Sequence, residues 1–399
     1  FRYPMFEWVH PWPDPLLTIH FAVVVAAALL VAAGLFYRPA CAVLFFGYTY
    51  IFLLEATRYN NHYYLMVLLC WLMVFLPAHR WFSVDAKLNT EVKSPSVPRW
   101  TYLVVIFQIW IVYTYASVAK WYPDWLNATV TELFMSGKSD YWLIGPFLQL
   151  EWVHWSIAYV GILFDLLIVP LLLWKRTRML GFLISIFFHL FNSIVFQIGI
   201  FPYMSIAFAL FFFSSETLQK RFLPKKQHYA AAVVKVPKYK PLLVGVFSIY
   251  FIIQIGLPLR HWAFQDDVLW TEEGHRLSWR MMLRSKASRL IVYVQEEGSI
   301  EKKAYNYRKL LSKKQQRAAK GKPDMLWRLA KEIKKAEAKA GRNVKVFMDV
   351  RLKVNGGEYH PYIKPDIDMA SQEWHPFKHH EWIEPSPTDY HARPEKKED

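Results

Sequence analysis

The chain is poor in cysteine: only Cys41 and Cys70 occur in 399 residues, and both lie within apolar stretches. A disulfide framework therefore cannot hold any water-exposed part together, so hydrophobic packing must do so. The sequence also lacks a Cys/His metal-ligand spacing, a glycine-rich phosphate loop and a Gly-x-Ser-x-Gly turn. These absences disfavour a metal site, an NTPase and an α/β-hydrolase.

The start of the chain has neither an initiator methionine nor the basic beginning and cleavage site of a signal peptide. Because the sequence begins at Phe1, we expect a further N-terminal helix to precede it.

Hydrophobic and charged residues are both abundant but are segregated along the chain. Hydrophobic residues make up 54% of the sequence, and the formal net charge is nevertheless +16. Residues 302–342 contain fifteen lysines and arginines against three acids. This segregation predicts a membrane domain over residues 1–260, followed by a basic, water-exposed domain over residues 261–399.

Eight apolar stretches approach the roughly 20 residues that a membrane-spanning helix needs. They cover residues 16–36, 40–55, 63–78, 101–119, 152–174, 179–197, 201–214 and 241–258. The stretch 201–214 is the weakest of them and is compatible with a re-entrant segment, although the turn at 199–202 favours a tight helical hairpin. The sequence thus predicts a multi-pass α-helical membrane domain.

Basic loops indicate the orientation, because short loops rich in lysine and arginine stay in the cytoplasm. Such loops occur at 175–178 and 220–240, and Arg38 and the loop 79–100 can lie on the same side. The beginning of the 63–78 span, Lys120 and everything after residue 258 would then lie on the non-cytoplasmic face. We therefore expect an integral membrane protein whose C-terminal domain and functional groups face away from the cytoplasm.

The C-terminal domain combines strand and helix patterns. Residues 344–354 alternate between apolar and mostly polar side chains, and residues 290–294 form a second strand-like run. Residues 308–340 between them favour two helices that are interrupted at 321–323. We predict a mixed β-sandwich domain with a basic helical insertion.

The basic charge of this insertion allows several interpretations. Nucleic-acid binding is disfavoured because the domain is expected outside the cytoplasm. A solvated helix surface is the ordinary interpretation, and attraction to anionic lipid or to an acidic substrate is the functional one. The sequence does not decide between these two.

Lys120 ends a span-length apolar run, and a helix over 101–120 places Tyr113, Ser117 and Lys120 on one face. Removing a lysine amine from water favours its neutral form, which can accept a proton. The competing interpretation is a lysine that reaches out to the headgroups and marks the helix end.

Other polar groups within the apolar stretches also have two interpretations. His189 shares a helical stripe with Ser185, Asn192 and Ser193, a pattern that either joins helices or contacts a ligand. Asp165 lies in the middle of a span, where an acid is costly and usually paired, but the sequence does not name its partner. The run 60–62 has the pattern of a helix cap, and its histidine is also suited to orient or deprotonate a substrate.

Several segments resemble, in order, those of one enzyme family. They are Arg58-Tyr-Asn-Asn-His-Tyr-Tyr-Leu65, Trp81-Phe-Ser-Val-Asp85, the run from Ile111 to Lys120, Phe188-His-Leu-Phe-Asn-Ser193 and Leu277-Ser-Trp-Arg-Met-Met282. Together they are similar to the vitamin K-dependent γ-glutamyl carboxylase family, whose membrane part belongs to the wider HTTM group. The likeness runs from residue 2 to about residue 382.

This resemblance implies an enzyme that oxidises reduced vitamin K with O2 and carboxylates protein-bound glutamate with CO2. In the family, a lysine that aligns with Lys120 deprotonates the hydroquinone, and oxygen addition yields a strong base and then the epoxide. That base removes the glutamate γ-proton, and the carbanion attacks CO2. The implied partners are a glutamate-containing protein or peptide and the lipid bilayer, without nucleic acid and without a metal.

The resemblance also implies roles for individual residues. His62 aligns with a catalytic histidine, and Asn61, His189 and Tyr113 fall into the quinone pocket. In the segment 270–282, Trp279 and Met281 are expected in the pocket wall, and a substrate carboxylate is expected to meet the side chains of His275, Arg276 and Arg280. Ordinary packing of this juxtamembrane segment is the competing interpretation.

Departures from the family pattern leave two further functions open. Animal members carry a disulfide that this chain cannot form, and a lysine pair where this chain has Ala119-Lys120. One alternative is a quinol epoxidase or monooxygenase that does not carboxylate glutamate. The other is a non-enzymatic membrane protein that binds lipid, in which Lys120 would contact headgroups.

Overall fold

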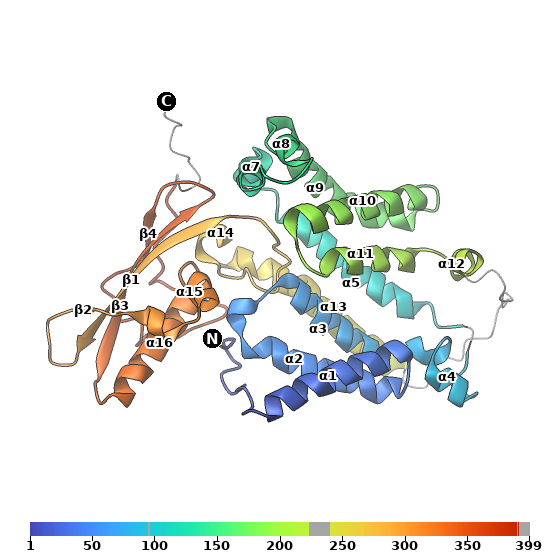
Figure 1. Ribbon diagram of the computed structural model, residues 1–399, viewed down its shortest axis with the longest axis horizontal. Helices are drawn as coiled ribbons and strands as arrows, with labels where there is room; N and C mark the ends of the chain where they lie inside the picture. The colour runs from blue at the N-terminus through green and yellow to red at the C-terminus, as the bar shows by residue number, and fades with distance from the viewer. Residues whose placement is uncertain (95, 223–239, 389, 391–399) are drawn as a thin grey trace.

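The computed structural model describes residues 1–94, 96–222, 240–388 and 390, and it contains a helical part and a smaller sheet part (Figure 1). The basic positions between 223 and 239 that contributed to the predicted orientation lie outside these residues.

Every predicted apolar stretch contains a helix. These helices are α1 (Leu16–Ala33), α2 (Tyr37–Leu54), α3 (Asn61–Phe75), α5 (Trp100–Val118), α9 (Glu151–Leu173), α10 (Arg178–Phe196), α11 (Phe201–Ala209) and α13 (Lys240–Leu259). Shorter helices connect them: α4 (Val84–Leu88), α6 (Pro123–Leu126), α7 (Thr129–Ser136), α8 (Gly145–Leu148) and α12 (Ser215–Phe222). The multi-pass helical prediction is confirmed.

The helices differ in their capacity to cross a bilayer. Within the described part of the chain, six are long and apolar enough, namely α1, α2, α5, α9, α10 and α13, whereas α3 has only 15 residues. The segment from α11 to α12 bends by 114° and is either a seventh, broken span or a re-entrant loop. A hydroxyl contact of 3.0 Å between Ser193 and Tyr203 joins α10 to α11.

Side chains from α3, α5, α9, α11 and α13 form the main core of the helical part. Asn60 begins α3 as its cap, because its side-chain oxygen accepts a hydrogen bond of 2.7 Å from the backbone N–H of His62. In Figure 1, α4 and α12 lie at the end of the helical part that is farthest from the sheet. The beginning of α3 and the end of α5 face the sheet part.

The C-terminal part contains one four-stranded antiparallel sheet in the order β2-β1-β3-β4. The strands are β1 (Lys286–Glu296), β2 (Lys303–Ala304), β3 (Val344–Val354) and β4 (His360–Ile363). Val292 on β1 pairs with Met348 on β3, and both are buried. Both predicted strands are confirmed, and the alternating run 344–354 is β3.

The second layer of this part differs from the predicted sandwich. Helices α15 (Lys313–Ala319) and α16 (Pro323–Lys339) form the basic insertion, and the predicted break between them is present. Leu326, Leu329 and Ile333 on α16 pack against the apolar face of the sheet. Because this helical stripe buries that face, a helix takes the place that we assigned to a second sheet.

Candidate active site

Lys120 lies two residues after the end of α5 and points into the interface between α5 and α9. Its amine donates hydrogen bonds to the Ala116 carbonyl at 2.9 Å and to Asp165 Oδ2 at 2.5 Å. The Lys120 and Asp165 side chains are each only 10% exposed. The ring of Trp125 on α6 lies 5.6 Å from the amine. The lysine therefore does not extend toward headgroups in this structure.

Close approach of α9 to the end of α5 creates this environment. A side chain at Gly161 on α9 would begin 3.7 Å from Trp125 and 4.0 Å from the Lys120 Cε atom. The Ser117 hydroxyl donates to the Ile162 carbonyl at 3.1 Å, and the Trp125 indole donates to the Ala158 carbonyl at 3.0 Å. A Cβ at Gly161 would thus make only ordinary contacts, and the two side-chain donors join α5 and α6 to α9 beside the lysine.

His189 is the second buried polar group of the interface, and only 1% of it is exposed. Its Nε2 atom lies 2.9 Å from the hydroxyl of Tyr113, which stands two turns before Lys120 on α5. The rings of Phe164, Phe188 and Phe201 surround the imidazole at centroid distances of 5.4, 5.5 and 6.0 Å. Its Nδ1 atom has no hydrogen-bond partner among the described residues.

His62 on α3 contacts Phe201, one of the three phenylalanines around His189. Its ring stacks on Phe201 with a centroid distance of 4.3 Å and an interplanar angle of 16°. Phe201 therefore contacts both predicted histidines, although nothing in the sequence singled it out. Asn61 has a different environment: its oxygen accepts from the Tyr59 hydroxyl at 2.8 Å, and its amide donates to the Arg280 carbonyl at 3.1 Å. Asn61 thus holds the segment around Arg280.

That segment, residues 277–282, closes over the ends of α3 and α5 that face the sheet. Leu277, Trp279 and Met282 have positive φ angles of 60°, 56° and 50°. Bulky residues rarely adopt this backbone conformation, which is held only where the surroundings enforce it, often at functional sites. The Tyr59 hydroxyl accepts a hydrogen bond of 2.7 Å from the Leu277 backbone N–H, and the Tyr122 hydroxyl donates to the Leu283 carbonyl.

The two residues predicted for the pocket wall lie in this segment. Trp279 is 1% exposed and stacks on Tyr64 of α3 at a centroid distance of 5.0 Å. Met281 is half-buried and packs against the main core of the helical part. Both side chains therefore join the membrane core although they follow the last apolar helix in the sequence.

The three residues predicted to hold a carboxylate have different electrostatic environments. Arg276 forms a buried ion pair with Asp324 of α16. Burial and the neighbouring Arg284 hold the pKa of His275 well below its usual value, so its ring is neutral at neutral pH. Burial lowers the pKa of Arg280 to about 10, so its guanidinium stays charged, and its Nε atom has no hydrogen-bond partner among the described residues. Of the three, Arg280 is thus the charged side chain that forms no ion pair among the described residues.

A buried charge cluster, not anticipated from the sequence, supports the segment from the sheet side. Glu272 lies between Arg284 and Lys286, with 2.7 Å between its Oε1 atom and the Lys286 amine. Burial alone would raise the pKa of Glu272, but the two cations hold it well below its usual value. The acid is therefore ionised and fixes both cations.

An apolar cavity of about 490 Å³, a size typical of small-molecule sites, lies between α3, α5 and α11. Its walls include Met66, Leu69, Met73, Val105, Met204 and Phe208. Ile200, next to Phe201 in the chain, also lines it. Within the described ranges, no group of three or more His, Cys, Asp or Glu side chains is arranged to hold a metal ion.

The Tyr113–His189 contact leads to a prediction about stability. Tyr113→Phe removes the hydroxyl and leaves Nε2 of a buried histidine unpaired, so we expect a loss of about 1–3 kcal/mol in unfolding free energy. Thermal unfolding of the detergent-solubilised protein measures the change. The control is Tyr293→Phe, which changes a half-buried residue on β1 outside the site. Equal unfolding temperatures of both variants and the parent would contradict the prediction.

Comparison with known protein families finds two matches along the chain. Residues 1–216 match the HTTM domain family, and residues 239–389 match the lumenal domain of vitamin K-dependent gamma-carboxylase. No solved structure matches the chain. The two matches cover nearly the whole sequence and confirm the resemblance. The chain therefore belongs to the vitamin K-dependent γ-carboxylase family and is a multi-pass membrane protein with an HTTM domain and a lumenal-type domain.

Proposed function

We propose that the protein is a γ-glutamyl carboxylase that couples oxidation of reduced vitamin K to carboxylation of glutamate. The observation that carries this proposal is the buried Lys120 amine in the membrane domain of a carboxylase-family chain. When bound, reduced vitamin K and O2 would supply the oxidation that makes removal of a glutamate γ-proton possible. The protein's own residues bind and orient the reduced quinone and accept its hydroxyl proton.

Lys120 and the other predicted site residues each have a role in this proposal. The Lys120 amine accepts a hydroxyl proton from the reduced quinone and then stabilises the resulting anion by its charge. His189 is held by Tyr113 at Nε2, so its Nδ1 atom is available to a quinone oxygen. Trp279 contributes an indole N–H that likewise has no partner among the described residues. His62 stacks on Phe201, whose ring also contacts His189.

The surroundings fit a quinone with an apolar tail. The cavity between α3, α5 and α11 is almost entirely apolar in its lining, and its residues come from predicted membrane helices. Unpartnered polar atoms at Trp279 and His189 lie among aromatic side chains of the same core. Lys120, His62, His189 and Trp279 do not line this cavity, so it supports a place for the apolar tail and not for the ring of the quinone. A substrate carboxylate would meet Arg280, where the 277–282 segment covers the helices.

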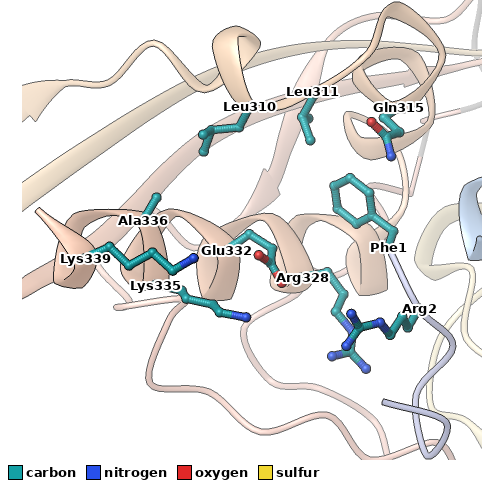
Figure 2. A pocket seen from close by; sticks show the side chains of 10 residues that line it. All are labelled: Phe1, Arg2, Leu310, Leu311, Gln315, Arg328, Glu332, Lys335, Ala336 and Lys339. Carbon is teal, nitrogen blue, oxygen red and sulfur yellow. The ribbon is translucent and has the colours of Figure 1, made fainter. Parts of the chain in front are cut away.

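A second cavity supports an acidic peptide as the other substrate. It has a volume of about 390 Å³ and lies between the start of the chain and α16 in the C-terminal part (Figure 2). Four basic side chains, those of Arg2, Arg328, Lys335 and Lys339, line it together with one acid, Glu332. Such a surface attracts a glutamate-rich chain, which favours coupled carboxylation over quinol oxidation alone.

This second cavity yields a prediction about peptide binding. Lys335→Glu combined with Lys339→Glu is expected to raise the KM for a glutamate-rich peptide about fivefold, since exposed charge pairs contribute only modestly. The KM for the quinol should not change. Added salt should reduce the difference because it screens exposed charges. Steady-state kinetics at two ionic strengths measure both constants.

The matched control is Lys345→Glu combined with Lys378→Glu, which changes the net charge equally at exposed sites outside the cavity. A control that weakens peptide binding as much as the cavity variant would show that overall charge, and not this surface, binds the peptide.

We further propose that the site and the sheet part face away from the cytoplasm. The support is that α4 and α12 lie at the end of the helical part opposite the sheet (Figure 1). Asp85 of α4 accepts hydrogen bonds from the backbone at the start of α2, beside Arg38, and α12 carries Lys220 and Arg221. Short loops rich in lysine and arginine stay in the cytoplasm, so this end of the helical part is assigned to the cytoplasmic side.

The test is incubation of the purified protein with reduced vitamin K, O2, ¹⁴C-bicarbonate and a glutamate-rich peptide, with epoxide and fixed label measured together. Both products support the proposal. Epoxide without label supports the alternative of a quinol epoxidase. Neither product, from folded protein that is also supplied with menaquinol, would leave a lipid-binding protein, an alternative that the buried setting of Lys120 disfavours.

A further inference from the structure

Asp165 is a buried acid in the middle of α9, and the structure gives it one charged partner. Its Oδ2 atom lies 2.5 Å from the Lys120 amine, and no other ion pair of Asp165 occurs among the described residues. An acid within an apolar span is costly unless it is paired. The two groups therefore form a compact ion pair, which is neutral as a whole, inside the helical core.

The neighbouring elements bring few other titratable groups to this pair. Tyr113 lies on the Lys120 face of α5, and His189 from α10 contacts the Tyr113 hydroxyl. From α6, Trp125 presents an uncharged ring, while Asp124 accepts a hydrogen bond of 2.6 Å from Asn355 and faces the sheet part. Arg280 and Arg284 belong to the covering segment, where Arg284 pairs with Glu272. Asp165 is thus the dominant charge for Lys120.

We propose that Asp165 is a positioning residue that fixes the Lys120 amine and keeps it strongly basic. The inference rests on the proposed role of Lys120 as the base. Burial without a counterion would make the amine a weak base, because it disfavours the ammonium form. A carboxylate in contact with the amine offsets this effect by attraction.

The hydrogen bonds also determine where the lone pair points. A neutral amine has two N–H groups and one lone pair, and the structure offers it two acceptors, the Ala116 carbonyl and Asp165. When both N–H groups are donated to them, the lone pair must point toward the remaining tetrahedral direction. Asp165 therefore aims the lone pair away from the helix backbone, where it can take a proton.

The first test needs no substrate. We would treat the protein with 1-fluoro-2,4-dinitrobenzene over a range of pH and follow modification of Lys120 by peptide mass spectrometry, because only the neutral amine reacts. In Asp165→Asn we expect the midpoint of labelling at least about one pH unit lower, a tenfold change in proton affinity. Asp165→Glu should restore most of the parent midpoint. An unchanged midpoint in Asp165→Asn would overturn the inference.

The second test is the pH dependence of epoxide formation. Asp165→Asn should move the acid limb of the rate profile to lower pH and reduce the high-pH plateau by at least roughly tenfold, since the amine is a weaker and less well-aimed base. A purely structural residue would lower the plateau without moving the limb. Glu151→Gln, at the start of α9, removes the same charge without contacting Lys120 and is the control.

The two proposals can fail separately. If Lys120→Ala keeps its activity, Lys120 is not the base and the proposed function loses its main support. If Lys120→Ala is inactive but Asp165→Asn keeps the parent profile and labelling midpoint, only the role of Asp165 is wrong. Should Asp165→Asn fail to fold, Asp165→Ser takes its place in the labelling test, because it removes the same charge with a smaller side chain, and an unchanged midpoint in that variant would likewise overturn the inference.

Discussion

Replacing Lys120 by alanine is expected to reduce epoxide formation and CO2 fixation together by roughly 10²–10⁴-fold, the usual contribution of a positioned general base. Both products should fall in parallel, because the proposed proton transfer precedes both. The quinol KM should change much less than kcat, since the site keeps its apolar walls. Simultaneous measurement of epoxide and fixed ¹⁴C at saturating quinol determines the effect.

Lys120→Arg separates the base from the ion pair. Arginine can keep a charged contact with Asp165 but does not lose its proton at any pH in the range of the assay. We expect this variant to fold like the parent and to be as inactive as Lys120→Ala. Lys175→Ala, an exposed lysine on the turn between α9 and α10, is the activity control. An active Lys120→Arg variant would rule out Lys120 as the base.

Glu272→Ala is expected to produce the largest loss of stability, about 3–5 kcal/mol, because it leaves the buried cations Arg284 and Lys286 without their shared counterion. The segment 277–282 lies between Glu272 and these cations in the chain, so its closed arrangement should loosen too. Thermal unfolding measures the stability. Increased proteolytic cleavage within 272–286 would report the loosening.

The pH dependence of this stabilisation follows from the pKa of Glu272. Burial would raise that pKa, but Arg284 and Lys286 outweigh burial and depress it in the folded protein. The contribution is therefore fully present above the ordinary carboxyl pKa and is lost as pH falls toward the folded value. Glu301→Ala, whose ion pair with Lys303 is exposed, should cost no more than about 1 kcal/mol. Equal losses in both variants would contradict the buried-cluster explanation.

The sequence was sufficient for features that arise from neighbouring residues. Apolar length located the helices, and the alternation over 344–354 located β3, because both depend on which side chains must avoid water. Local capping at Asn60 and the break at 321–323 were likewise readable from a few adjacent residues. Ordered motifs identified the family and drew attention to Lys120, His62 and His189.

Only the tertiary structure decided which of these groups meet. Asp165 and Lys120 are 45 positions apart, and Arg276 pairs with Asp324 on α16, so no local pattern could connect them. The same holds for Phe201 between the two histidines and for α16 in place of a second sheet. Contacts between distant elements depend on how helices approach each other, which is set by the packing of the whole molecule. The sequence by itself therefore determined the elements, the family and the candidate base, whereas the partners of Lys120 came from the folded arrangement.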